Sequence, residues 1–293
     1  MGAAVKVAGQ TADLHLRKTD SGCDAEPLAH ANSCFGSLTF EFRSSDQIVR
    51  QLTSDHQNQF KADFHREAVR LEEWTAARGW PAPSIPSIQV TVSDQFKISK
   101  ALVPAWNGQA GHMEFPSWRV ASRKAAIAHE LVHVFFPSGN RFLAEGLAVY
   151  LQAEIGGNPA FPNFGRPLHE LARELLHEMI PAFSPGHPDS LAQLHLADLD
   201  AIATPSPLEL KVGGDLYGEE PRGQARIYPL AGSFVQFLIE TRGLEQFRVL
   251  YGRTPLVPFE QAAGSRERWF DVYGLSFTAL EGEWKSLIAG RSI

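Results

Sequence analysis

A run of five residues, His129-Glu130-Leu131-Val132-His133, constrains the fold more than any other feature of this sequence. Apolar residues recur around it at helical spacing, including Ile127 and Phe135, so we expect the run inside a helix whose apolar side is buried. Residues i and i+4 of a helix lie one turn apart on the same face. The pattern therefore predicts two imidazoles and a neighbouring carboxylate close together beside an apolar core.

The spacing of these three side chains suits a metal site. Two histidines one turn apart can both reach one Zn²⁺ at about 2.0–2.1 Å, and the glutamate beside the first can hydrogen-bond a water on the metal. Zinc lowers the pKa of such a water toward neutrality, and a carboxylate base can then make it an attacking hydroxide. We therefore expect His129 and His133 as zinc ligands and Glu130 as general base.

A catalytic zinc needs a third protein ligand, and the sequence offers Glu145. It is the one acidic residue in the apolar segment 140–150, where a carboxylate is costly to bury unless it is paired or bound to metal. A short turn would let its helix pack antiparallel to the motif helix. A carboxylate facing water is the other interpretation of Glu145.

Other ligand schemes fit the sequence less well. The extended H-x-x-G-x-x-H scheme needs glycine at 136 and histidine at 139, but the chain has Phe136 and Gly139. Two further His-Glu pairs, which begin at His169 and His177, lack the second histidine and fit the solvated face of an amphipathic helix. We therefore expect no metal role for them.

Local patterns predict the order of the other elements. Alternating polar and apolar residues predict strands at 37–42, 88–92 and 111–115. Helical spacing with cap and stop residues predicts helices at 47–77, 123–136, 141–155, 167–179, 229–241, 244–251 and 277–288. Ser45 or Asp46 would cap the first helix and Asn140 the third. The fold class is therefore α+β, with strands before the motif helix and a mainly helical C-terminal part.

Composition limits the classes of partner. The chain has 293 residues, 44% of them apolar, which is enough for a sizeable core. A formal charge of −6, with lysines and arginines scattered along the chain, makes nucleic acid a poor partner. Its apolar runs are far shorter than the roughly 18–20 residues that span a bilayer, so no membrane span is expected. Oligomeric state is not encoded in any pattern we recognise.

The two cysteines bear on localisation. Cys23 and Cys34 lie eleven positions apart, a spacing that fits a small disulfide-closed loop or two unrelated thiols. The even count favours the disulfide. A disulfide would favour a periplasmic or secreted protein over a cytoplasmic one.

These residues resemble the gluzincin group of zinc peptidases, the thermolysin-like and aminopeptidase-N-like enzymes, in which H-E-x-x-H precedes a helix bearing a glutamate ligand. The phrase Leu143-Ala144-Glu145-Gly146-Leu147-Ala148 is similar to the E-G-x-A signature of that helix. The resemblance covers about residues 85–290. It implies a zincin-like, peptidase MA-like metallopeptidase domain at 85–293, with residues 1–84 as a lead-in, strand and long helix that pack on it.

The resemblance also implies a tyrosine that donates to the oxyanion. Gluzincins commonly take this tyrosine from a downstream helical region, and Tyr228 fits by position and context, since it precedes Pro229 at an expected helix start. Tyr217, Arg226 and His112 are the substitutes. A tyrosine half-buried for packing is the other interpretation of Tyr228.

Some positions depart from the family pattern. Only eleven residues separate His133 from Glu145, a shorter connection than in thermolysin or aminopeptidase N. Val149 stands where thermolysin-like enzymes have a carboxylate that orients a histidine, so that orienter is unidentified. Met113-Glu114 is similar to the aminopeptidases' G-x-M-E-N element, with phenylalanine in place of the asparagine. Glu114 is therefore either a contact for a substrate's amino terminus or an ordinary edge-strand residue.

The expected function is hydrolysis of peptide bonds in a peptide or protein substrate, with the strand at 111–115 offering an exposed edge to an extended peptide. A zinc amidase acting on small molecules or cell-wall peptides is one alternative. A non-catalytic binding module that keeps the zincin-like fold is another. The intact ligand set with Glu130 argues against the non-catalytic module, because such decay usually removes the base or a ligand.

Overall fold

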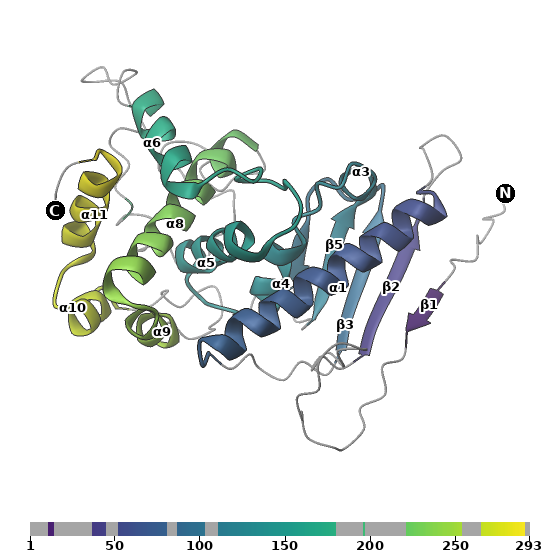
Figure 1. The fold of residues 1–293 in the computed structure, drawn as a ribbon, viewed down its shortest axis with the longest axis horizontal. Coiled ribbons are helices and arrows are strands. Elements are labelled where there is room, and N and C mark those ends of the chain that lie inside the picture. Colours follow the sequence, from purple (N-terminus) through teal and green to yellow (C-terminus); the bar gives the residue numbers. More distant parts are fainter. Residues whose placement is uncertain are drawn as a thin grey trace, which may run out of the picture. The chain divides into compact units, whose positions relative to one another are not determined.

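The computed structural model describes residues 11–14, 37–44, 52–80, 87–102, 111–179, 196, 221–253 and 265–290. The chain divides into two compact units, Met1–Ala125 and Ala126–Ile293. The first unit holds the strands and the second is helical, so the chain is mixed α and β (Figure 1). The expected boundary between residues 84 and 85 falls inside the first unit, and the assignment of domains stays a prediction.

The first unit is built on a five-stranded sheet with the order β1-β2-β3-β5-β4. Its strands are β1 (Thr11–Leu14), β2 (Ser37–Arg43), β3 (Ser87–Ser93), β4 (Lys100–Leu102) and β5 (His112–Pro116). The three inner strands β2, β3 and β5 are parallel, and the outer strands β1 and β4 pair antiparallel to them. The alternating patterns predicted the three inner strands to within one residue and missed both outer ones.

One face of the sheet packs against helix α1 (Ser54–Ala77). Phe40, Val90 and Met113 stand in register across β2, β3 and β5, and all are buried. The rings of Phe60 and Phe64 on α1 meet this face, with centroids 6.1 Å and 5.4 Å from that of Phe40. Burial of this aromatic cluster holds the helix on the sheet.

The start of α1 lies later than predicted. The helix begins at Ser54 rather than Gln47, and its N-cap is Thr53, whose side chain accepts the backbone N–H of His56 at 3.2 Å. The expected caps Ser45 and Asp46 lie outside the described residues. Thr53 is as good a cap by type, so only the tertiary setting distinguishes the two positions.

The strand β5 is not an edge, which corrects the expectation for residues 111–115. It lies between β3 and β4, and the edge belongs to β4. Glu114 is therefore an inner-strand residue, and its carboxylate pairs with Lys100 of β4 at 2.8 Å. Three residues are too few to show an alternation, which is why β4 gave no signal in the sequence.

The second unit contains seven helices of at least seven residues in the described part. These are α4 (Ile127–Phe135), α5 (Arg141–Ile155), α6 (Leu168–Met179), α8 (Pro221–Arg242), α9 (Leu244–Gly252), α10 (Glu267–Tyr273) and α11 (Phe277–Ile288). The predicted bounds of α5 and α11 are confirmed. The short helix α10 was not predicted.

Two helix predictions near the motif need correction. The helix predicted at 123–136 begins later, at Ile127 of α4, because Arg123 has a φ of 55° that no right-handed helix accommodates. A short helix that was not predicted, α3 (Ser117–Ala121), ends before Arg123 in the first unit. The helix predicted to open at Pro229 begins at Pro221 instead, so Pro229 lies in its interior. Proline favours the first turn of a helix, and that preference misled the prediction.

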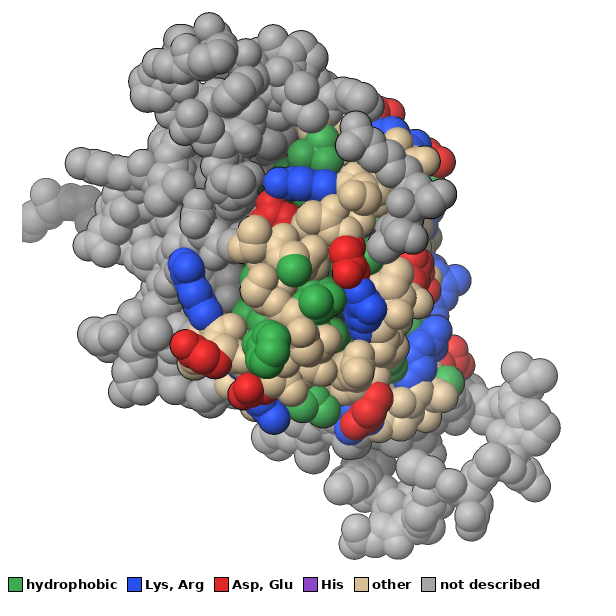
Figure 2. All heavy atoms as spheres, turned by 90° about the vertical axis from the view of Figure 1, so that its left-hand side faces the viewer, with side chains coloured by type: hydrophobic (Ala, Val, Ile, Leu, Met, Phe, Trp, Pro, Cys, Tyr) green, Lys and Arg blue, Asp and Glu red, His purple; other side chains and the backbone are tan. Residues whose placement is uncertain are grey.

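The surface of the second unit over α10 and α11 carries acidic and basic side chains interspersed, with apolar ones in small groups (Figure 2). Such a surface offers no broad field of one sign to a polyanion. Among the helices that the structure describes, none is long and apolar enough to cross a membrane.

Candidate metal centre

The connection between α4 and α5 fixes the two helices that carry the motif residues. The Asn140 side chain accepts the backbone N–H of Leu143 at 2.9 Å, which confirms it as the N-cap of α5. Its own backbone N–H donates to Ser138 Oγ at 3.1 Å. From α9, the Tyr251 hydroxyl donates to the carbonyl of Phe136 at 2.6 Å, where α4 ends. Hydrogen bonds from the turn itself, from the start of α5 and from α9 therefore fix the connection.

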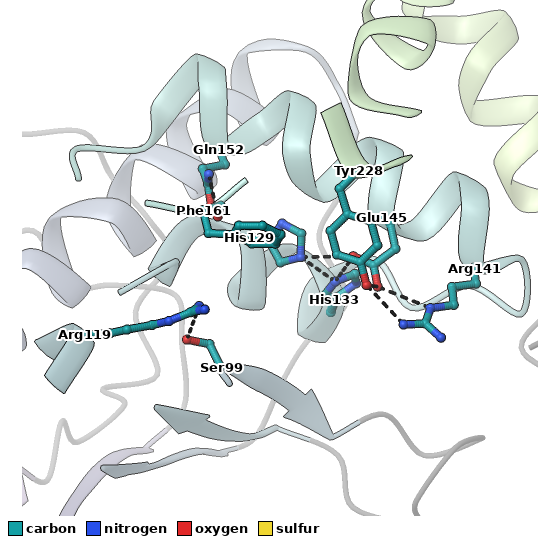
Figure 3. A network of polar contacts seen from close by, with 9 residues as sticks. All are labelled: Ser99, Arg119, His129, His133, Arg141, Glu145, Gln152, Phe161 and Tyr228. Atoms are coloured by element: carbon teal, nitrogen blue, oxygen red, sulfur yellow. Dashed lines mark hydrogen bonds and ion pairs between the residues drawn. The ribbon is translucent and has the colours of Figure 1, made fainter. Parts of the chain in front are cut away.

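Three side chains from α4 and α5 converge on one point (Figure 3). Nε2 of His129 lies 3.1 Å from Nε2 of His133 and 3.1 Å from Oε2 of Glu145, and Nε2 of His133 lies 3.4 Å from the same oxygen. All three side chains are buried. They form the one group of three or more potential metal ligands in the described part of the chain.

The triangle of donor atoms fits a tetrahedral zinc ion. The three donor atoms lie close enough together for all of them to hold one zinc ion at about 2.0–2.1 Å. No fourth protein ligand joins the group in the described part of the chain, so one position of a four-coordinate zinc would be left for water. Two imidazoles and a carboxylate are also the donor types that zinc takes in hydrolytic sites. The residues present therefore fit the metal that the sequence predicts.

The charges at this point favour a cation. Burial alone would raise the pKa of Glu145, but attraction to His133 and hydrogen bonds from both histidines outweigh it and hold that pKa well below its usual range. Burial would lower the pKa of His133, whereas the carboxylates of Glu145 and Glu130 raise it, and the net direction is upward. An anionic carboxylate beside two imidazoles stabilises positive charge between them.

The second oxygen of Glu145 has its own partners. The Tyr228 hydroxyl donates to Oε1 at 2.9 Å, and Arg141 Nη2 donates to that hydroxyl at 3.1 Å. Arg141 Nε lies 3.7 Å from the same Oε1. Figure 3 shows the three side chains grouped on one side of the histidines. Glu145 thus presents one oxygen to His129 and His133 and the other to Tyr228 and Arg141.

Two glycines allow α8 to come close enough for this contact. A Cβ on Gly146, the residue after Glu145, would lie 2.7 Å from Val235 Cγ2 and 2.9 Å from the carbonyl oxygen of Ala231. A Cβ on Gly232 of α8 would lie 2.5 Å from Val149 Cγ1. Neither distance is tolerable, so the α5–α8 approach requires both glycines. This approach carries Tyr228, one turn before Gly232, to Glu145.

The same packing accounts for Val149. Its side chain lies against Gly232 at the α5–α8 contact, where an ionised group would be buried without water. Nδ1 of His129 is buried and finds no hydrogen-bond partner among the residues that the structure describes. The group that orients this histidine therefore stays unidentified.

The other candidates from the sequence lie elsewhere or outside the description. His112 and Glu114 belong to the sheet of the first unit. Tyr217, Cys23 and Cys34 lie outside the described residues, as does the side chain of Arg226. His169 contacts Ser233 Oγ at 2.8 Å and Glu240 at 3.4 Å on α8, so it serves helix packing. Of His177 only the backbone, in α6, is described.

The sequence analysis missed Arg141 and Phe161. Arg141 stands four residues before Glu145 on the same helix, and this ion-pair spacing was visible in the sequence. The Phe161 ring lies 6.1 Å from that of Tyr228. Its loop position gave no signal, because 67 residues separate the two rings in the chain.

Comparison with known proteins gives weak matches. No family model matches the sequence, and no curated protein matches it. Among solved structures, the chain is similar to the M1 zinc metallopeptidase from Deinococcus radiodurans and to a point mutant of it, each at 14% identity, and to that mutant bound to a Tyr-Ser-Ala substrate at 13%. Each match has a TM-score of 0.41 and covers 88% of this chain and 49% of the other. The chain thus spans about half the length of those structures.

Proposed function

We propose that the chain is a zincin-like, zinc-dependent peptidase of the gluzincin type. The observation that carries this proposal is the buried triangle of His129 Nε2, His133 Nε2 and Glu145 Oε2, with sides of 3.1–3.4 Å. Three convergent ligands of these types, with no fourth protein ligand among the described residues, are typical of a hydrolytic rather than a structural zinc site.

Zinc bound by these three residues would supply a Lewis acid that polarises a scissile carbonyl and acidifies a water molecule. Glu130 is the base that takes the proton of the attacking water and passes it to the leaving amine. It follows His129 in the chain, it is 4% exposed, and its charge raises the pKa of His133. Its burial and its influence on His133 support this role, because a base in such a site needs to lie near the ligands and to be poorly solvated.

Tyr228 is the proposed donor to the oxyanion. Its single hydroxyl proton points to Oε1 of Glu145, so it must turn from this oxygen to donate to a substrate carbonyl. Arg141 Nη2 donates to the hydroxyl oxygen, a contact that can persist through the turn and that favours negative charge there. Arg141 thereby positions Tyr228 and makes it a stronger donor.

The amidase alternative would use the same residues, whereas a binding module would hold the metal without turnover. Metal content and peptide cleavage measured together on wild type and Glu130→Gln separate these functions. We expect about one zinc per chain in both proteins and peptide cleavage in the wild type that falls at least 10²-fold in Glu130→Gln. Full activity of Glu130→Gln would exclude the mechanism, and zinc binding without hydrolysis of peptides or small amides would leave the binding module.

A further inference from the structure

The loop between α5 and α6 places two aromatic rings beside Tyr228. The Phe161 ring is 6.1 Å from the Tyr228 ring and 6.0 Å from the Phe164 ring, which it meets edge to face at 77°. The Tyr228 ring in turn stacks on His129, with centroids 6.1 Å apart and planes at 17°. A continuous row of rings thus leads from His129 to Phe164.

The loop is a built structure. Gln152 of α5 is buried, and its Nε2 lies 3.3 Å and 3.1 Å from the carbonyl oxygens of Ala160 and Phe161 and 2.7 Å from Asn163 Oδ1. Asn163 is also buried, and its Nδ2 donates to the carbonyl of Arg166 at 3.1 Å. Figure 3 shows the contact from Gln152 to the Phe161 backbone. These contacts fix the backbone on which both rings stand.

Phe164 has a strained backbone, and burial of its side chain contributes little stability to offset the strain. Its φ is 51°, in the left-handed region that phenylalanine rarely adopts. Its side chain is nonetheless 50% exposed, so folding buries little apolar surface in return. Backbone strain of this kind clusters at active sites and ligand contacts, where the surrounding structure maintains it.

We propose that Phe161 and Phe164 bind a large apolar side chain of the substrate next to the scissile bond. This inference rests on the proposed function and names its substrate class: peptides with an aromatic or branched aliphatic residue near the cleavage point. The row of rings is the observation behind this inference. If the Tyr228 hydroxyl donates to the carbonyl of the cleaved bond, a side chain next to that bond can reach the neighbouring ring of Phe161. The nearby Arg166 is paired with Glu174 at 2.5 Å, so the loop offers no unpaired cation from that residue to an acidic side chain.

The test compares two peptides that differ only in one residue beside the cleaved bond, phenylalanine in one and alanine in the other. We expect wild type to favour the phenylalanine peptide in kcat/KM, since an apolar contact of this size is worth roughly 10–200-fold. Phe161→Ala and Phe164→Ala should each reduce that preference, the ratio of the two kcat/KM values, about tenfold or more. Phe164→Leu should restore most of the preference.

Phe270→Ala is the matched control, because Phe270 is 64% exposed on α10 and takes no part in the row of rings. It should leave the preference unchanged. An unchanged preference in both loop variants, with full zinc content, would overturn the inference while leaving the proposed function intact.

A wild type that cleaves neither peptide would contradict the proposed function instead. Binding of the uncleaved phenylalanine peptide to the zinc-loaded protein still tests the loop in that case. Binding at least tenfold weaker in Phe164→Ala than in Phe270→Ala supports the aromatic contact, and equal binding refutes it.

Discussion

Glu145 and Tyr228, 83 residues apart in the chain, are joined by a hydrogen bond of 2.9 Å from the phenol to Oε1 of the carboxylate. The other oxygen, Oε2, lies 3.1 Å from His129 Nε2. The bond thus fixes the rotation of the carboxylate, so that Oε2 faces the two histidines. It also ties the helix that carries the proposed oxyanion donor to the helix that carries the proposed third ligand.

Removing Glu145 should weaken zinc binding without unfolding the protein. Glu145→Ala deletes a charged ligand, and we expect at least 10²-fold lower zinc affinity, since even partners that only orient a ligand are worth 10–100-fold. Competition with a chromophoric chelator measures the affinity. Glu154→Ala is the matched control, because Glu154 lies on the same helix and is exposed. Equal affinity in Glu145→Ala and wild type would remove Glu145 from the site.

Tyr228→Phe should separate catalysis from metal binding. The variant loses a hydrogen bond to the oxyanion that forms mainly in the transition state. The value of kcat should therefore fall by roughly 10²-fold or more with little change in KM. Zinc content at saturating zinc and the circular dichroism spectrum should match wild type, because the ring and its stacking on His129 remain. The zinc affinity should fall by no more than about 10–100-fold, since only the hydrogen bond that orients Glu145 is lost. A kcat within about threefold of wild type would contradict this role and direct the search to Tyr217 or Arg226.

The α5–α8 approach can be tested through stability. Gly232→Ala forces a methyl group to within 2.5 Å of Val149 Cγ1, and such overpacking costs about 1–3 kcal/mol in the free energy of unfolding. Gly282→Ala is the control: nothing lies within 4 Å of the added Cβ on α11, so this change should stabilise by about 0.5–1 kcal/mol. Urea unfolding of both variants gives the comparison. A neutral or stabilising Gly232→Ala would mean that the helices are not this close.

Local patterns predicted the parts of this fold that local physics decides. Asn140 accepts the N–H of Leu143, and the helix after it ends at Ile155, as cap and stop residues indicated. The spacing of His129 and His133 likewise placed both imidazoles on one helix face, where the structure has them 3.1 Å apart. Each of these features depends on residues within a turn or two of one another.

The features that were missed depend on distant parts of the chain. No pattern near residues 111–115 predicts that β4 pairs with β5 and becomes the edge strand in its place. Pro229 looks like a helix start until the turns before it are seen packed as helix. The Glu145–Tyr228 bond requires two glycines, on different helices, to meet opposite Val235 and Val149. Family resemblance suggested Tyr228, but the sequence alone could not show what its hydroxyl touches.

A last prediction concerns His169 and the pH dependence of stability. Burial lowers the pKa of His169, and the charge of Glu240 offsets this only in part. Trp284 Nε1 donates to Ser233 Oγ at 3.0 Å, so the serine hydroxyl can donate its proton to His169 Nδ1, 2.8 Å away, when the imidazole is neutral. Protonation of the imidazole removes that acceptor and charges a partly buried ring.

The sign of the effect follows from the direction of this shift. With a pKa below its ordinary value of 6.5 in the folded state, His169 binds fewer protons folded than unfolded. Its contribution to stability is therefore present above about pH 6.5 and is lost as the pH falls through the lowered value. Urea unfolding at pH 7.5 and pH 5.5, in chelator so that zinc release plays no part, should show wild type losing more stability than His169→Gln. An equal loss in the two proteins would show that His169 does not titrate with folding.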